Sequence, residues 1–144
     1  MSGLRDIQEG AAALIRAAFA RKGGMPPVWC ASPSDSATLA AEAMAAAGAG
    51  LTVNPPSFAP EAAGSCDLPY GYGTLEIAAF EQPDACRASG TSGALEAVEE
   101  AVRALNRATV GGHMLQLDPS GIRSSAAGGT ATCRAAFRFD WQFG

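Results

Sequence analysis

The sequence predicts an α+β fold, in which one mixed or antiparallel sheet of about five strands carries helices packed on one face. The first supporting observation is the closing segment, residues 130–143, where apolar and polar side chains alternate. The second is the order of the other segments: helical patterns and short apolar strands alternate early in the chain, and strands follow one another late. At 144 residues, the chain is expected to form one domain that spans residues 1–144.

The closing segment predicts a long strand with two different faces, because successive side chains of a strand point to opposite sides. Arg134 and Arg138 share the polar side. A sheet covered on both faces would show a continuous apolar run instead, so helices are expected to cover the aromatic side only. The aromatic side carries Phe137, Phe139, Trp141 and Phe143.

The first element is predicted to be a helix over residues 2–22, because apolar side chains recur there at helical spacing. Ser2 is placed to cap its start, and two glycines at 23–24 end it. Two prolines then lead into a short strand predicted at 28–31. The apolar stripe of the helix consists of Leu4, Ile7, Ala11, Leu14, Ile15, Ala18 and Phe19.

An Ala-rich helix is predicted next, which begins after the cap oxygens of residues 34–36, runs through about residue 47 and ends at Gly48. It leads to a strand at 51–53, which ends at an Asn-Pro-Pro sequence. Residues 55–71 are then predicted to form a long loop. A connection of this length is uncommon within a compact domain and is usually functional or part of an interface.

The second half of the chain is predicted to contain a strand at 74–82, a loop at 83–93 and a helix at 94–107. A further strand is predicted at 113–117, directly after two glycines. The Asp-Pro-Ser-Gly sequence at 118–121 is typical of a turn. The closing strand then completes the sheet.

The composition, with 48% hydrophobic and 17% charged residues, indicates a globular protein. A net charge of −4 and a pI near 4.9 argue against sequence-independent binding of nucleic acid, which requires clustered Lys and Arg. No apolar run approaches the length of a membrane span, and residues 1–10 lack the apolar core of a signal peptide. The four cysteines have no CxxC spacing and are therefore expected to be free thiols in a cytosolic protein.

No residue pattern predicts catalysis, a metal site or a cofactor. His113 is the only histidine, and a structural role is expected for it because no second histidine can share a metal. The Gly-Thr-Ser-Gly sequence at 90–93 precedes a helix, as in a phosphate-binding loop, but Ala94 stands where such a loop needs Lys. A helix-capping turn is expected there, and the protein is predicted not to be an enzyme.

Five residues are candidates for contact with another protein. Arg134 and Arg138 lie on the polar side of the closing strand, which either faces water or meets another subunit, where Arg is over-represented. The pattern leaves both interpretations open. Phe58, Tyr70 and Tyr72 lie in or beside the long loop, which is unusually apolar for a solvated connection, and aromatic residues are favoured interface anchors.

Several short sequences together resemble a family of small bacteriophage tail terminator or tail completion proteins, which also occur in prophages. The resemblance covers roughly residues 35–143 and rests on DSATLAAEAM at 35–44, GLTVNPP at 50–56, GTLEI at 73–77 and GTSGALEAVEEAV at 90–102. The closing alternating strand also fits the family pattern.

This resemblance implies a structural role without catalytic residues. A tail terminator forms a homo-oligomeric ring, typically a hexamer, on the last ring of the tail tube. It stops tube growth and presents a surface to the neck and head-completion complex. The implied partners are further copies of this chain, the major tail tube protein and a neck or head-completion protein, within a virion tail assembled in the bacterial host cytoplasm.

Other functions remain open from the sequence. A neck or head-completion protein, which connects head and tail, would come from the same region of a virion. A small ligand-binding or enzymatic α+β domain would need convergent polar groups, and the sequence offers one histidine and scattered cysteines. A toxin or immunity-type partner protein is a further class.

Overall fold

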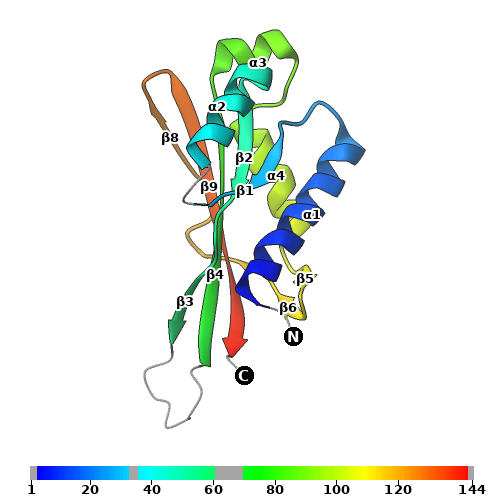
Figure 1. Cartoon of the computed structure of the whole chain (residues 1–144), viewed down its shortest axis with the longest axis vertical. Helices are drawn as coiled ribbons and strands as arrows, with labels where there is room; N and C mark the ends of the chain where they lie inside the picture. Colours follow the sequence, from blue (N-terminus) through cyan, green and yellow to red (C-terminus); the bar gives the residue numbers. More distant parts are fainter. Residues whose placement is uncertain (1–2, 33–35, 61–69, 143–144) are drawn as a thin grey trace.

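The computed structural model describes residues 3–32, 36–60 and 70–142, which form an elongated molecule (Figure 1). The predicted α+β class is confirmed. The helices are α1 (Leu4–Lys22), α2 (Ser36–Ala47), α3 (Pro83–Ser89) and α4 (Ala94–Leu105). The strands are β1 (Val28–Cys30), β2 (Ala49–Val53), β3 (Ser57–Pro60), β4 (Tyr70–Glu81), β5 (Thr109–Val110), β6 (His113–Met114), β7 (Gln116–Leu117), β8 (Arg123–Ala127) and β9 (Thr130–Gln142).

A seven-stranded mixed sheet forms the centre of the molecule. Its main path runs β1-β2-β4-β9-β7, with β3 paired to β4 and β8 paired to β9. β1 and β2 are parallel, whereas the other pairs of this sheet are antiparallel. β5 and β6 form a separate two-stranded hairpin. The sheet is therefore mixed, as predicted, and its additional strands are short ones at the edges.

The two longest strands, β4 and β9, lie side by side at the middle of the sheet and pair along almost their whole length. The predicted alternation of β9 is confirmed, because Phe137, Phe139 and Trp141 are buried while Arg134 and Arg138 are exposed. One parity of this strand therefore belongs to the core and the other faces outward.

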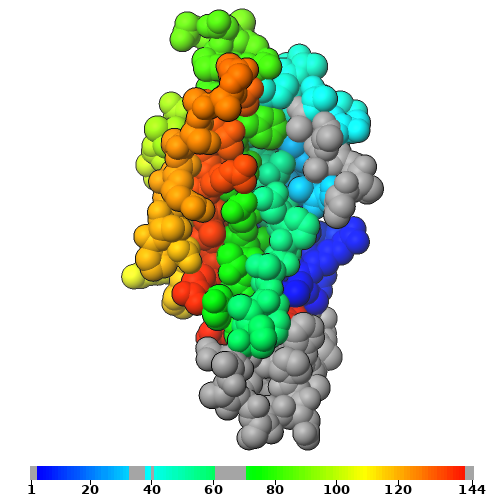
Figure 2. Space-filling view, turned by 90° about the vertical axis from the view of Figure 1, so that its left-hand side faces the viewer, coloured from blue at the N-terminus to red at the C-terminus, as the bar shows by residue number. Residues whose placement is uncertain are grey.

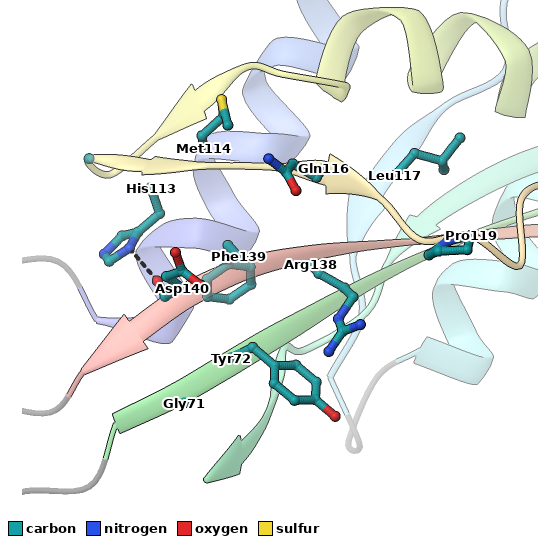
Figure 3. A pocket seen from close by; sticks show the side chains of 11 residues that line it. Gly71, Tyr72, His113, Met114, Gln116, Leu117, Pro119, Arg138, Phe139 and Asp140 are labelled. Carbon is teal, nitrogen blue, oxygen red and sulfur yellow. Dashed lines mark hydrogen bonds between the residues drawn. The ribbon is translucent and has the colours of Figure 1, made fainter. Parts of the chain in front are cut away.

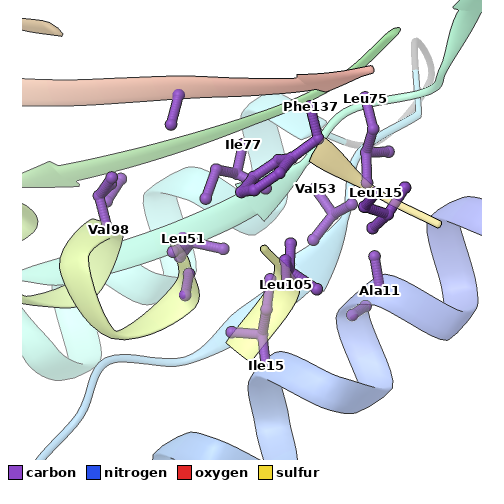
Figure 4. Packing of buried hydrophobic residues seen from close by; sticks show 14 of the residues in the cluster. Ala11, Ile15, Leu51, Val53, Leu75, Ile77, Val98, Leu105, Leu115 and Phe137 are labelled. Carbon is purple, nitrogen blue, oxygen red and sulfur yellow. The ribbon is translucent and has the colours of Figure 1, made fainter. Parts of the chain in front are cut away.

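The hydrophobic core lies between that aromatic side of the sheet and the helices α1 and α4 (Figure 4). Ile15 of α1 and Leu105 of α4 meet Leu51 of β2 and Phe137 of β9, and none of these side chains is exposed. Full burial of a side chain of this size contributes about 1.5–3 kcal/mol. α1 and α4 thus cover one face of the sheet, as predicted, while α2 packs against β2 and α3.

One polar side chain, Gln8, is buried on the packed face of α1. Its Nε2 donates to the carbonyl oxygen of Ala31 at 3.1 Å and to that of Val53 at 2.7 Å. These two carbonyls end β1 and β2, so a single amide ties the first helix to the edge of the sheet. These hydrogen bonds hold α1 in position against the sheet. If α1 moved away, the buried amide and the carbonyls would lose their partners and would each cost the full desolvation penalty.

The loop predicted at residues 83–93 contains the helix α3, so this prediction is wrong. Pro83 occupies the first turn, where a helix does not need its missing N–H, and Gly90 ends the helix with a left-handed φ of 72°. The hydroxyl of Ser89 donates to the carbonyl oxygen of Ala47 at 2.7 Å. A helix this short depends on such tertiary contacts, which the local sequence does not reveal.

The strand predicted at 113–117 is divided in the structure. β6 pairs with β5 and β7 pairs with β9, while Leu115 between them is fully buried. The N–H of Leu115 donates to the carbonyl of Ala108, and its own carbonyl accepts from the N–H of Arg107. The side chain of Leu115 is buried in the core at this point, and it interrupts the strand that the sequence predicts.

The edge strands β3 and β8 are absent from the sequence-based prediction. β3 and the first two residues of β4 lie within residues 55–71, so the prediction of a loop is wrong for these residues. β8 connects to β9 through Gly128 and Gly129, whose φ angles of 60° and 79° suit a tight hairpin turn. All β8 residues are exposed, so this strand lacks the apolar alternation by which strands are recognised.

The cysteines of the described chain, Cys30, Cys86 and Cys133, are free thiols. Burial is the main cause that raises the pKa of the Cys30 and Cys86 thiols. Within the described ranges, no helix combines the length and the apolar character that a membrane span requires. The fourth cysteine of the chain, Cys66, lies outside the described residues, as do Ser2 and Phe143 from the sequence analysis.

Candidate interaction face

On the side of the sheet away from α1 and α4, polar side chains follow β4 and β9, which run down its middle (Figure 2). At the β1–β2 end of this side, Trp29 and Phe80 pack against each other over Gly50. We call the surface that the polar side chains form the polar face. It is built from the side chains that alternate with the core residues of β2, β4 and β9, and from their register partners on β7 and β8. Its main polar members are Thr52, Asn54, Tyr72, Thr74, Glu76, Gln116, Arg123, Arg134, Arg138 and Asp140.

Glu76 connects three strands across the polar face. Its Oε1 accepts from the side-chain amide of Asn54 on β2 at 3.1 Å and from the Arg134 guanidinium on β9 at 3.2 Å. The side chains of Arg134 and Glu76 are 50% and 35% exposed, so solvent screens this ion pair and it contributes at most about 1 kcal/mol. Half of the Arg134 side chain remains available to a partner.

Arg138 and Tyr72 form a second pair on this face. The guanidinium carbon of Arg138 lies 4.0 Å from the centre of the Tyr72 ring, on the neighbouring strand β4. At an exposed site, this cation–π contact contributes about 0.5–1 kcal/mol and orients the cation. No carboxylate of the described residues forms an ion pair with Arg138. An oriented positive charge is therefore presented outward beside an aromatic ring.

A groove of about 550 Å³ lies between the β6–β7 segment and the ends of β4 and β9 (Figure 3). Arg138 of β9 and Tyr72 of β4 form one wall of this groove. His113 and Met114 of β6 and Gln116 of β7 form the facing wall. Met114 is one of the exposed large hydrophobic side chains of the described chain, at 46%. The groove thus joins a cation, polar groups and an exposed apolar side chain.

His113 attaches β6 to the end of β9. With its proton on Nδ1, the ring donates a hydrogen bond to the carbonyl oxygen of Asp140 at 2.7 Å. The same ring packs against Trp141, with the ring centres 4.9 Å apart. These two contacts hold the His113 ring in place. In the described residues, no group of three His, Cys, Asp or Glu side chains could hold a metal ion.

The five candidate interaction residues do not lie together. Tyr72, Arg134 and Arg138 share the polar face. Phe58 is half-buried and packs against the hydrophobic core, because its register partner on β4, Gly73, has core parity. Tyr70 is the first residue of β4, and its side chain lies outside the described residues.

The start of α4 is occupied by a carboxylate. A Cβ atom on Gly93 would lie 2.6 Å from an oxygen of Glu81, which places that carboxylate against the N-terminus of the helix. A negative charge is favourable at this position, because the helix dipole and the free N–H groups are positive there. The same charge repels an incoming phosphate, and this agrees with the capping turn expected at residues 90–93.

The sequence analysis missed several residues of the polar face, among them Glu76, Gln116 and Arg123. Glu76 shares the parity of Thr74, and this pattern could have placed it there. Gln116 and Arg123 belong to the face only through register, since they lie opposite Arg138 and Arg134 on β9. Pairing between distant segments leaves no local signal in the sequence.

No family model and no curated protein matches the chain. Among solved structures, it is similar to a chain of the virion of a native gene transfer agent (GTA) particle, with a TM-score of 0.62 and 15% identity over 96% of each chain. The two chains share a fold. A crystal structure from Akkermansia muciniphila aligns with 13% identity over 95% of this chain and 74% of that one, but its TM-score of 0.35 carries no argument.

Proposed function

We propose that the protein is a structural virion component of a phage-like particle, and that it is a tail terminator. In this role, copies of the chain form a ring that caps the tail tube and meets the neck or head-completion complex. The observation that carries the proposal is the fold similarity to a chain of a gene transfer agent virion, which extends over 96% of both chains. The tail-terminator resemblance of the sequence motifs supports the more specific assignment. The proposal assigns no catalysis, cofactor or metal to the chain.

The polar face is the part of the molecule proposed to mediate assembly. Arg and Tyr are enriched at protein interfaces, where they act as anchors. Arg138 and Tyr72 are exposed or half-exposed and already oriented against each other, so little conformational freedom is lost on contact. The net charge of −4 supplies acidic groups on neighbouring copies. Phe58 instead contributes to the core, and the proposal does not use it.

The deciding experiment is imaging of the purified protein by negative stain, together with its molar mass from light scattering. Rings that bind the ends of isolated tail tubes are the expected result. A monomer at every concentration that leaves tube ends unchanged would contradict the proposal. Rings that do not bind tail tubes but bind a head or neck complex would support the head-completion role instead.

Variants of the polar face test where the contact lies. Arg138→Glu, and separately the double change Tyr70→Ala with Tyr72→Ala, should keep the circular dichroism of the parent and lose the ring or its binding to tubes. Arg87→Glu is the matched control, because that arginine is exposed on α3, outside the polar face. If the polar-face variants assemble like the parent, the interface lies elsewhere, and the outer side of α1 is the next surface to test.

A ligand-binding domain is the second candidate, and the groove beside Arg138 and His113 is the observation that favours it. Elemental analysis and native mass spectrometry of the purified protein address this candidate directly. Stoichiometric metal or a bound small molecule would support it. A native mass equal to a multiple of the chain mass would support the structural role.

A further inference from the structure

The β8–β9 hairpin is the least covered part of the sheet. β8 pairs with β9 on one side, from Arg123↔Arg134 to Ala127↔Thr130, and all of its residues are exposed. Its other edge pairs with no strand of the described residues. A two-stranded ribbon is marginally stable alone in water, and an unpaired edge of this kind is a template for another chain. Ile122, directly before it, is 37% exposed.

The second such element is the helix α2, which packs against β2 and α3 on one side and is exposed on the other. It has one charged residue, Glu42, and among its described side chains only Ala43 is buried. Thr38, Ala41 and Ala45 are exposed, and the helix has no clear division into a polar and an apolar side. A helix that is apolar around its circumference is normally covered by other protein. In the isolated chain, α2 lies at the surface.

These two elements lie at opposite edges of the same end of the molecule, with β8 along one side and α2 along the other (Figure 2). At the β1 edge of the sheet, the Arg16 guanidinium of α1 already donates to the carbonyl oxygen of Val28. The α2 side therefore offers a helix surface to a neighbour rather than a free strand. Contact between two different surfaces at opposite edges is the head-to-tail arrangement from which closed rings are built.

The two surfaces carry opposite charges. Arg123 of β8 and Glu42 of α2 are both exposed, and within the described residues neither takes part in an ion pair. Opposite charges across a contact steer association and fix its register. In a contact between two copies, Ile122 and Arg123 of one copy would meet the apolar helix α2 of the other, which carries Glu42.

We propose that the partner of the β8 hairpin is a second copy of this chain, and that α2 of one copy packs against β8 of the next, with Glu42 facing Arg123. This contact rests on the ring proposed above and names the two surfaces that close it. The part of the polar face around Tyr72 and Arg138 remains free to contact the tail tube or the neck.

The test is a charge exchange between the two surfaces. Arg123→Glu and Glu42→Arg should each weaken self-association about tenfold or more, as measured by light scattering over a concentration series. The double variant, in which the charges are exchanged, should recover most of the parent's association. Arg5→Glu is the matched control, because that arginine is 86% exposed on α1 and undergoes the same charge change. Equal melting temperatures for all variants exclude a folding effect.

The outcomes separate this contact from the ring proposal. If the parent forms rings and the single variants assemble normally, or the double variant does not recover, the contact is overturned and the ring stands. A dimer that depends on Arg123 and not on Glu42 would mean that β8 pairs with β8 of another copy, and this also overturns the contact. A parent that stays monomeric overturns both proposals.

Discussion

At Phe139, one aromatic ring lies over a glycine of the neighbouring strand. The two residues are register partners on β9 and β4, and a Cβ atom on Gly73 would come within 2.2 Å of the Phe139 ring. The ring also packs edge-on against Trp141, with the ring centres 6.2 Å apart. At the scale of single residues, this end of the sheet is therefore stabilised by an aromatic ring that fills the space above a glycine, which has no side chain of its own.

The first prediction concerns this aromatic side. Phe139→Ala removes a side chain that is 3% exposed, and loss of burial plus the remaining cavity should lower the free energy of unfolding by about 3–5 kcal/mol. Asp140→Ala, one position along on the exposed side, should change it by less than about 0.5 kcal/mol. Urea unfolding of both variants measures the difference. Equal stability of the two would contradict the assignment of faces on β9.

The second prediction concerns Gly73. Gly73→Ala forces a methyl group against the Phe139 ring and should destabilise the protein by about 1–3 kcal/mol, as overpacking does. Combining it with Phe139→Leu, which vacates the space above Cα, should recover part of the loss. A double-mutant cycle of thermal or urea unfolding gives the coupling energy. Simple additivity of the two changes would show that the ring and the glycine do not interact.

At the scale of elements, the turns decide where strands begin and end. Between β7 and β8, the N–H of Gly121 donates to the carbonyl of Asp118 at 2.9 Å, which closes the turn predicted at 118–121. The N–H of Ser120 also donates to Oδ1 of the Asp118 side chain at 2.9 Å. This backbone N–H, followed by weaker contributions from other groups, lowers the pKa of the Asp118 carboxyl below its ordinary value.

The third prediction is a pH dependence of this turn. A carboxyl whose folded-state pKa is lowered stabilises the fold above its unfolded pKa, about 4, and loses this contribution as the pH falls through the folded value. Asp118→Ala should therefore lower the melting temperature at pH 7, and the deficit should shrink progressively below about pH 4. Melting curves of parent and variant across this range test it. A deficit that is constant with pH would assign the effect to the turn geometry alone.

At the scale of the whole molecule, two helices and one face of the sheet form a core, while the polar face and the two opposite edges stay uncovered. The fold does not bury these surfaces itself, and the proposed ring gives each of them a partner. The acidic balance of the chain, −4 overall, contrasts with the arginines gathered on the polar face and β8. Copies of the chain can therefore attract one another through different surfaces.

The fourth prediction follows from this charge arrangement. Raising the salt concentration from about 0.1 M to about 1 M shortens the screening length from about 10 Å to about 3 Å. Assembly should therefore weaken, while the melting temperature of the chain, which depends on the apolar core, should not fall. Light scattering and calorimetry in the same buffers measure the two effects. Assembly that is unchanged or stronger in high salt would indicate an interface without these charges.

The sequence by itself determined the α+β class, the presence and approximate positions of α1 and α4, and the two faces of β9. Each of these follows from a periodicity of side chains that is written along one continuous segment. The outward position of Arg134 and Arg138 could be predicted for the same reason. The register of β9 against β4 could not be predicted, so Glu76 and Arg123 could not be placed beside these arginines.

Only the tertiary structure decided which distant segments meet. It turned Phe58 toward the core, divided the strand at 113–117 around Leu115, and formed α3 where the local sequence favoured a loop. It also built the groove from four separate strands, β4, β6, β7 and β9, and left β8 and the outer side of α2 exposed at opposite edges. The physical reason is that strand pairing and helix packing join residues far apart in the chain, and their energies depend on neighbours that a local pattern does not contain.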